Sequence, residues 1–120
     1  MKILIIDDST INNIFMQSIL EEEGYETKSA LDGYEAFRKI EEFQPDLIIL
    51  DIMMPEISGF DVLEKLSHNQ IFIPVIAISA YKDKKYEKRA ISMGASSYLH
   101  KPIKSDDLFK TIEECKVNHH

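Results

Sequence analysis

The sequence predicts an α/β fold in which a parallel sheet is covered by helices on both faces. Short, continuous apolar runs such as residues 3–6 and 47–50 are typical of strands buried on both sides, as in a parallel sheet. Segments with helical spacing of apolar residues lie between such runs. The two patterns alternate five times with short links, which is typical of right-handed βαβ crossovers.

The first strand and first helix are predicted within residues 3–24. Residues 3–6 form the strand, and Ser9 or Thr10 supplies the N-cap of the helix. Apolar residues then recur at helical spacing, at Ile11, Ile14, Phe15, Ile19 and Leu20. Gly24 suits the residue just past a helix C-terminus, so we expect the helix to end there.

A second helix and the strands on either side of it follow. Residues 25–29 alternate in polarity, which suits an outer strand. Helical spacing returns at Ala36, Phe37, Ile40 and Phe43. This helix must stop before Pro45, because the residue preceding a proline is disfavoured in the helical conformation. Residues 47–50 are the third predicted strand, and Asp51 follows them directly.

The second half of the chain continues the alternation. Apolar spacing predicts three more helices, with Phe60, Leu63 and Leu66 in one, Tyr86, Ala90 and Met93 in the next, and Leu108, Ile112 and Cys115 in the last. Residues 73–78 and 97–99 are predicted strands, the former tolerating Pro74 near its start. Gly94 ends the middle helix and Ser105 caps the last one.

Five strands favour the doubly wound order 2-1-3-4-5, which is the flavodoxin-like arrangement. A length of 120 residues is close to the usual size of one domain, and we place that domain at residues 1–118. His119 and His120 are typical of the remains of a purification tag and are left out of the functional argument.

Composition narrows the class of protein. The chain is 44% hydrophobic and 29% charged, and 21 acidic against 14 basic residues give a net charge of −7. This charge argues against direct nucleic-acid binding and suits a cation site on a monomer. The single cysteine, Cys115, cannot form an internal disulfide. With no membrane-length apolar run and no signal peptide, we expect a cytoplasmic protein.

Polar side chains that carry chemistry follow the predicted strands. In the order 2-1-3-4-5 the first and third strands are neighbours, so Asp7, Asp8 and Asp51 meet at one edge, joined by Ser79 and Lys101 from the last two strands. Three close carboxylates repel one another, and a hard cation such as Mg²⁺ relieves the repulsion. With a lysine and a hydroxyl, such a site handles phosphoryl groups. Asp51 is the predicted nucleophile, because carboxylates form aspartyl phosphates.

These residues also support a family resemblance. Asp7-Asp8, Asp51 with Met54-Pro55 and Gly59, Ser79-Ala80 and Lys101-Pro102 occur in this order after the predicted strands. On these residues the chain resembles the receiver domains of two-component response regulators, from Ile3 to the region of Lys116. The resemblance implies that Asp51 takes a phosphoryl group from a phosphohistidine on a histidine kinase or a histidine phosphotransfer protein.

The resemblance also implies a metal site. Asp8, Asp51 and the backbone carbonyl of Met53 are expected to bind Mg²⁺ directly, with Asp7 acting through water. Lys101 is expected to contact Asp51 at rest and the phosphoryl group afterwards.

The resemblance implies a conformational switch as well. The Ser79 hydroxyl is expected to follow the phosphoryl group, and Tyr98 to turn inward into the space that Ser79 leaves. The surface of the helix around residue 90, the strand at 97–99 and the last helix then changes. The resemblance further implies a cis peptide between Lys101 and Pro102.

Two further expectations concern the rate of dephosphorylation and a partner. Met53 cannot donate a hydrogen bond to a hydrolytic water and Tyr81 is bulky, so we expect slow self-dephosphorylation and no other enzymatic activity.

The basic residues Lys82, Lys84, Lys85, Lys88 and Arg89 fit either a solvated helix face or a docking site for an acidic partner. His68 and His100 have no ligand spacing, so no transition metal is expected.

Other functions remain open at this point. A phosphatase of the haloacid dehalogenase type also uses a strand-end aspartate and Mg²⁺ but needs an acid where this chain has Met53. A flavodoxin-like carrier needs a hydroxyl-rich phosphate loop where this chain has Asp7 and Asp8. A receiver can also serve as an unphosphorylated scaffold. The sequence does not identify the kinase or the output. Two choices also stay open: a monomer or a phosphorylation-dependent dimer, and a stand-alone protein or one domain of a hybrid kinase or larger regulator.

Overall fold

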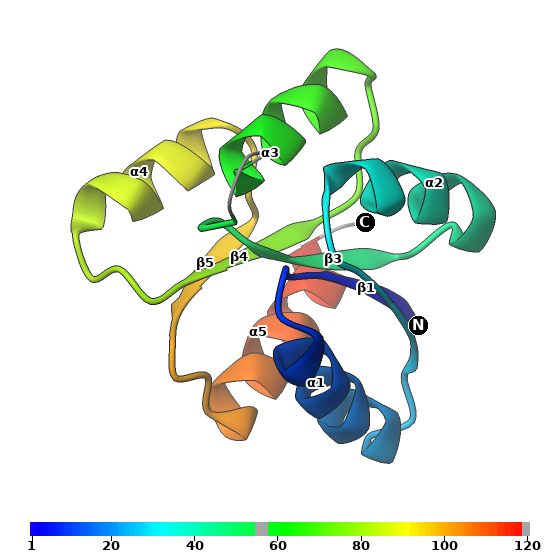
Figure 1. The fold of residues 1–120 in the computed structure, drawn as a ribbon. Coiled ribbons are helices and arrows are strands. Elements are labelled where there is room, and N and C mark those ends of the chain that lie inside the picture. Colours follow the sequence, from blue (N-terminus) through cyan, green and yellow to red (C-terminus); the bar gives the residue numbers. More distant parts are fainter. Residues whose placement is uncertain (55–57, 119–120) are drawn as a thin grey trace.

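The computed structural model describes residues 1–54 and 58–118 and has five strands alternating with five helices (Figure 1). The strands are β1 (Lys2–Ile6), β2 (Glu26–Ala30), β3 (Leu47–Asp51), β4 (Val75–Ser79) and β5 (Ser97–His100). The helices are α1 (Thr10–Glu22), α2 (Gly33–Phe43), α3 (Gly59–His68), α4 (Lys84–Ser92) and α5 (Ser105–Asn118). Pro55, which contributes to the family resemblance, and the two terminal histidines lie outside the described residues.

All five strands are parallel and their order is β2-β1-β3-β4-β5, as predicted. Helices α1 and α5 cover one face of the sheet, and α2, α3 and α4 cover the other (Figure 1). Every residue of β3 and β4 is buried, which is why their sequences are continuous apolar runs rather than alternating ones.

Two separate clusters form the core, one on each face of the sheet. Alternate strand residues point to opposite faces, so Leu4 and Ile48 pack with α2, α3 and α4, whereas Ile3 and Ile49 pack with α1 and α5. A parallel sheet covered in this way leaves the carboxyl ends of its strands as the natural place for a site.

The first helix forms as predicted, but only the C-terminal part of its predicted apolar stripe is buried. Ser9 is the N-cap, and Gly24 follows the C-cap with a φ of 93°. Ile11, Ile14 and Phe15 are 78%, 62% and 59% exposed. The buried face consists of Asn13, Met16 and Leu20, and Ile19 packs partly buried against the same core, so the last two residues of the predicted stripe do face the sheet. The buried stripe also has helical spacing, and only the way α1 lies on the sheet selects it.

Several predicted boundaries move by one or two residues. Tyr25 precedes β2, and Ile73 and Pro74 precede β4, so Pro74 lies outside the ladder that it would have weakened. Ser105 is the first residue of α5 rather than its cap. Within residues 1–54 and 58–118, every helix is too short or too polar to cross a membrane.

Candidate metal centre

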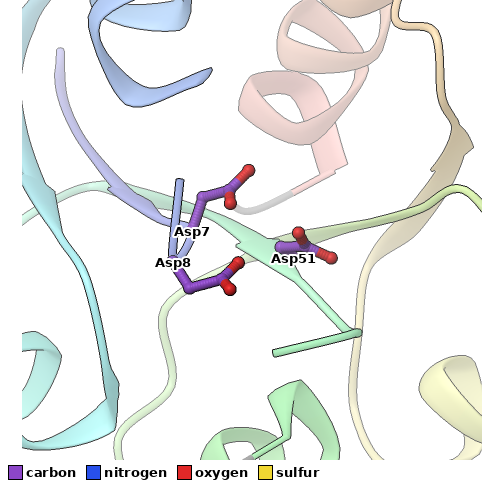
Figure 2. A group of neighbouring side chains, drawn as sticks. All are labelled: Asp7, Asp8 and Asp51. Carbon is purple, nitrogen blue, oxygen red and sulfur yellow. The ribbon is translucent and has the colours of Figure 1, made fainter. Parts of the chain in front are cut away.

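Three carboxylates meet where β1 and β3 end. The register pairs Ile6 with Leu50, so Asp7 and Asp51 leave the sheet side by side, and Asp8 follows. One carboxylate oxygen from each of Asp7, Asp8 and Asp51 lies within 4.8 Å of the others (Figure 2). Asp7 and Asp51 are only 2% and 4% exposed, whereas Asp8 is exposed to solvent. This grouping confirms that the predicted acids come together.

Asp7 is held in place by its own loop and by α1. The backbone N–H of Ser9 donates to Asp7 Oδ1 at 2.9 Å, and Asn12 Nδ2 lies 3.5 Å from Oδ2. The buried amide of Asn13 donates to the backbone carbonyl of Asp7 at 3.0 Å. Sequence reasoning missed both asparagines. The signal for Asn13 was its helical spacing with Met16 and Leu20 on the stripe that proved to be buried.

Asp51 is clamped between a backbone amide and a lysine. The N–H of Met53 donates to Oδ1 at 2.9 Å, and Lys101 Nζ donates to Oδ2 at 3.0 Å. Lys101 also lies 3.4 Å from Asp7 Oδ2, so one ammonium bridges two buried carboxylates. The predicted contact of Lys101 with Asp51 is therefore present. Met53 contributes its backbone N–H to the site, and the residue as a whole is 37% exposed.

The pKa values of Asp51 and Lys101 are both raised, but for different reasons. Burial raises the pKa of Asp51 above the ordinary carboxyl value, and the Asp7 carboxylate adds to the rise. The bonds from Met53 and Lys101 oppose it but only partly. Burial alone would lower the pKa of Lys101, yet the hydrogen bond and charge of Asp51, together with Asp7, raise it. The lysine is therefore fully charged, and it compensates an acidic pair that burial disfavours.

Gly59, the first residue of α3, approaches the end of β3 closely. Its N–H donates to the Ile52 carbonyl at 2.8 Å. A Cβ at this position would lie 2.6 Å from both the Asp51 carbonyl oxygen and the Ile52 Cα. Real Cβ atoms do not approach backbone atoms so closely, so glycine is required here by the close approach rather than by φ.

Ser79 and Lys101 reach the same edge from β4 and β5. In the ladders, Asp51 pairs with Ile78 and Ser79 pairs with His100. Ser79 therefore lies one residue beyond the level of Asp51, and Lys101 lies one residue beyond the level of Ser79. Ser79 is fully buried, and its Oγ accepts a hydrogen bond from the Tyr81 N–H at 3.0 Å. A hydroxyl that accepts one bond retains its hydrogen for a second partner.

Tyr98 lies on β5. Its ring is partly buried against the cluster beneath α2, α3 and α4, with the His100 ring at 5.3 Å. Its hydroxyl is buried and has no hydrogen-bond partner among residues 1–54 and 58–118. An unpaired buried hydroxyl costs about 1–3 kcal/mol. The peptide between Lys101 and Pro102 is cis, as the resemblance implied.

The predicted basic residues lie on and just before α4. Lys82, Lys84, Lys85, Lys88 and Arg89 are all exposed. Lys85 Nζ is 3.8 Å from Asp83, and the Arg89 guanidinium lies 4.1 Å from the centre of the Phe60 ring. These contacts leave most of the positive charge facing solvent.

A pocket of about 530 Å³ lies directly beside the acids, between α1 and the loops that follow β4 and β5. Asp7 and Lys101 form its polar end, and Phe15, Met16, Ile78 and Ile103 form its apolar walls. The exposed stripe of α1 therefore continues into the site rather than standing apart from it.

The donor set suits a hard divalent cation. All three side chains offer only carboxylate oxygens, the ligands that Mg²⁺ prefers, and the two buried ones, Asp7 and Asp51, have Lys101 as counter-charge. Mg²⁺ keeps several waters and typically uses one or two carboxylates plus a phosphate, which the exposed Asp8 side of the cluster permits.

Comparisons with known proteins agree with this geometry. The family model for the response regulator receiver domain matches residues 3–113. The polar-differentiation response regulator DivK of Brucella ovis is 35% identical over 113 residues, which are 92% of each chain. The alkaline phosphatase synthesis transcriptional regulatory protein PhoP of Bacillus subtilis is 37% identical over 103 residues, which are 85% of this chain but only 42% of that protein.

Solved structures show the same fold. The receiver domain of the Francisella response regulator 1452 has a TM-score of 0.91 and 31% sequence identity, covering 99% of this chain and 98% of that one. The chemotaxis protein CheY4 of Vibrio cholerae has a TM-score of 0.88 and 28% identity, covering 95% of this chain and 97% of that one.

Proposed function

The chain belongs to the family of response regulator receiver domains, and we propose that Asp51 accepts a phosphoryl group from a phosphohistidine on a histidine kinase or histidine phosphotransfer protein. A carboxylate oxygen of Asp51 forms a bond to phosphorus as the P–N bond breaks. The bonding pair leaves with the imidazole, which takes up a proton, and the product is an aspartyl phosphate. The observation that carries this proposal is the buried Asp51 carboxylate, 3.0 Å from Lys101 and beside two further acids.

Each remaining site residue has a role in this transfer. Asp8, Asp51 and the Met53 carbonyl would bind Mg²⁺ directly, with Asp7 acting through water. The cation would neutralise charge on the phosphoryl oxygens. Lys101 moves from the Asp51 carboxylate to a phosphoryl oxygen, which keeps its charge paired throughout.

The partner that delivers the phosphoryl group must cover the edge of the sheet around Asp51. We place part of its contact on the exposed residues Ile11, Ile14 and Phe15 of α1. Phe15 also lines the pocket that ends at Asp7 and Lys101, so a partner seated on this stripe reaches the acids without a gap. Exposed apolar residues grouped in this way are typical of an interaction surface.

Phosphorylation then switches a more distant surface. The phosphoryl group adds roughly two negative charges and strong acceptor oxygens, which attract the Ser79 hydroxyl and Lys101. Tyr98, whose hydroxyl is buried and unpaired among the described residues, occupies the inward position more stably once Ser79 has moved. The surface formed by α4, β5 and α5 changes in consequence, and its exposed basic residues on α4 suit an acidic partner.

The domain would act as a signalling switch and not as an enzyme with turnover on a separate substrate. Its only reactions would be phosphoryl transfer to Asp51 and slow hydrolysis of the product. It would work in the cytoplasm without direct contact to nucleic acid, as a monomer or a dimer that forms on phosphorylation. A phosphatase of the haloacid dehalogenase type would need an acid at position 53, where this chain has Met53.

One experiment tests the phosphoacceptor directly. The protein is treated with acetyl phosphate or phosphoramidate and Mg²⁺, and its mass is measured. We expect a gain of one phosphoryl group that is stable to acid and labile to base, and that Asp51→Asn abolishes. Asp106→Asn, an exposed aspartate on α5, is the matched control and should retain the gain. A mass gain that persists in Asp51→Asn would contradict the proposal.

A further inference from the structure

Helix α4 is held on the fold by few buried side chains. Of its nine residues, all of which are described, Ala90 alone is buried, whereas α3 buries five of ten. Tyr86 contributes a partly buried ring near the N-terminal end of the helix. The position of this end therefore depends on contacts that Tyr86 makes at the edge of the core.

Two other rings flank Tyr86. The Tyr81 ring, in the loop before α4, has its centre 5.3 Å from that of Tyr86 at an angle of 34°. The Phe60 ring of α3 lies 6.5 Å from the Tyr86 ring at 22°, and the Arg89 guanidinium covers Phe60. These separations are in the range where aromatic pairs attract one another. The three rings thus link the loop after β4 to α4 and on to α3.

Tyr81 is also bound to the proposed switch residue through its backbone. Its N–H donates to the buried Ser79 Oγ at 3.0 Å. The carbonyl of Ser79 accepts the Lys101 N–H at 2.8 Å, which ties the Ser79 backbone to the end of β5. The Ser79 hydroxyl is therefore free to turn about its side-chain bond, whereas its backbone is not. A turn of the hydroxyl moves the acceptor on which the Tyr81 amide depends.

We propose that Tyr81 is a positioning residue that couples the Ser79 hydroxyl to the N-terminal turn of α4 through its ring contact with Tyr86. The inference rests on the proposed function, because it is the phosphoryl group on Asp51 that draws the hydroxyl away. The Tyr81 peptide then follows the hydroxyl or loses its bond, and either outcome displaces the ring against Tyr86. This route is separate from Tyr98, whose ring contacts His100 on β5.

The coupling follows from differential contacts in the two states. At rest, Tyr81 makes both its backbone bond to Ser79 and its ring contact to Tyr86. With the phosphoryl group present, one of the two contacts must change, so the group biases the position of α4 without touching it. The Tyr81 ring is half exposed, so its removal leaves the two core clusters intact.

The test measures amide hydrogen exchange of α4 with and without beryllofluoride and Mg²⁺, which together mimic the phosphoryl group. The wild-type protein should show a change in exchange across residues 84–92. In Tyr81→Ala, which removes the ring and retains the amide, that change should fall at least twofold at equal occupancy of the site. Tyr81→Phe should restore it, since the ring contact does not need the hydroxyl.

Two further variants separate the ring contact from general effects. Tyr34→Ala removes another exposed tyrosine, on α2, and should leave the response of α4 unchanged. Tyr86→Ala should weaken the response as much as Tyr81→Ala does, and the double variant should weaken it no further.

The outcomes also distinguish this inference from the proposed function. A wild-type protein that shows no response to beryllofluoride with Mg²⁺ would overturn both. A wild-type response that persists undiminished in Tyr81→Ala would overturn the coupling through Tyr81 alone. An equal loss of the response in Tyr34→Ala would also overturn the coupling, because the loss would then not be specific to the ring contact between Tyr81 and Tyr86.

Discussion

Replacing Lys101 by methionine should reveal how much the acidic cluster depends on one cation. Methionine retains most of the length of the side chain and removes its charge. Asp51 and Asp7 are both buried, and Lys101 Nζ lies 3.0 Å and 3.4 Å from their oxygens. Without Lys101, the groups within residues 1–54 and 58–118 that still donate to the two buried carboxylates are the backbone N–H groups of Ser9 and Met53 and the Asn12 amide.

The size of the effect follows from burial. Removing one partner of a buried ion pair costs about 3–5 kcal/mol. The Lys101 side chain is 25% exposed, which favours the lower end, about 3 kcal/mol. For a domain of this length each kcal/mol shifts the unfolding temperature by about 4 °C, so Lys101→Met should melt about 12 °C below the wild type in the absence of divalent cations.

The way the stability of Lys101→Met changes with pH and Mg²⁺ shows whether the loss of stability is electrostatic. The pKa of Asp51 is already raised, and loss of Lys101 removes an interaction that lowers it. A carboxyl group with a raised pKa in the folded state stabilises the fold fully below its unfolded pKa, near 4, and that stability is lost as pH rises through the folded pKa. The difference in unfolding temperature between the wild type and Lys101→Met should therefore become smaller as pH falls from 7 towards 4. Mg²⁺ should shrink it at pH 7 by supplying the missing charge.

Thermal unfolding followed by circular dichroism measures both effects. Lys104→Met, at an exposed lysine three positions further along, is the matched control and should melt close to the wild type under every condition. A Lys101→Met variant as stable as the wild type at pH 7 without Mg²⁺ would refute the reasoning. So would a deficit that neither acid nor Mg²⁺ reduces, because the loss would then not be electrostatic.

Three further predictions concern the start of α3, the partner surface and the lifetime of the product. Gly59→Ala should destabilise the fold by about 1–3 kcal/mol in urea unfolding and weaken Mg²⁺ binding, because the added Cβ would lie 2.6 Å from the carbonyl oxygen of Asp51. Phe15→Ser should slow phosphoryl transfer from a protein donor but not from acetyl phosphate, since a protein donor contacts α1 and the small molecule does not. The aspartyl phosphate should persist for minutes or longer in the wild type, and Met53→Asn should shorten its half-life about tenfold, the equivalent of one hydrogen bond to the hydrolytic water.

Each of these predictions has a control and a contrary result. Gly94→Ala strains a residue with a φ of 109° far from the acids, so it should lower stability and leave Mg²⁺ affinity unchanged. Equal loss of Mg²⁺ affinity in both glycine variants would refute the first prediction. Equal slowing with both donors in Phe15→Ser would argue against a docking role. A wild-type half-life of only seconds would contradict the expectation drawn from Met53.

The strands and their order were predictable because the signal is local. Residues 47–50 are apolar without a break, and a strand buried on both faces has no solvent side on which to alternate. Once five such strands alternate with helices, few topologies remain, and the acids at 7, 8 and 51 must meet. Ser79 and Lys101 followed from the same reasoning.

Other features depend on how the elements pack, which no local pattern contains. The first helix carries two apolar or mixed stripes at helical spacing, and its fit to the sheet buries the one with Asn13 and exposes the one with Phe15. The Lys101 ammonium bridges Asp7 as well as Asp51, which depends on the stagger between strand ends. The ring contact between Tyr81 and Tyr86 likewise appears only in three dimensions.

The amino-acid sequence by itself determined a five-stranded parallel sheet and a carboxylate edge at its strand ends, because burial on both faces and residue order are written along the chain. The tertiary structure alone decided which side of α1 faces solvent, which groups compensate the buried charges and which rings connect the edge to α4. Those outcomes depend on distances between segments far apart in the chain, and such distances are set by the packing of the whole domain.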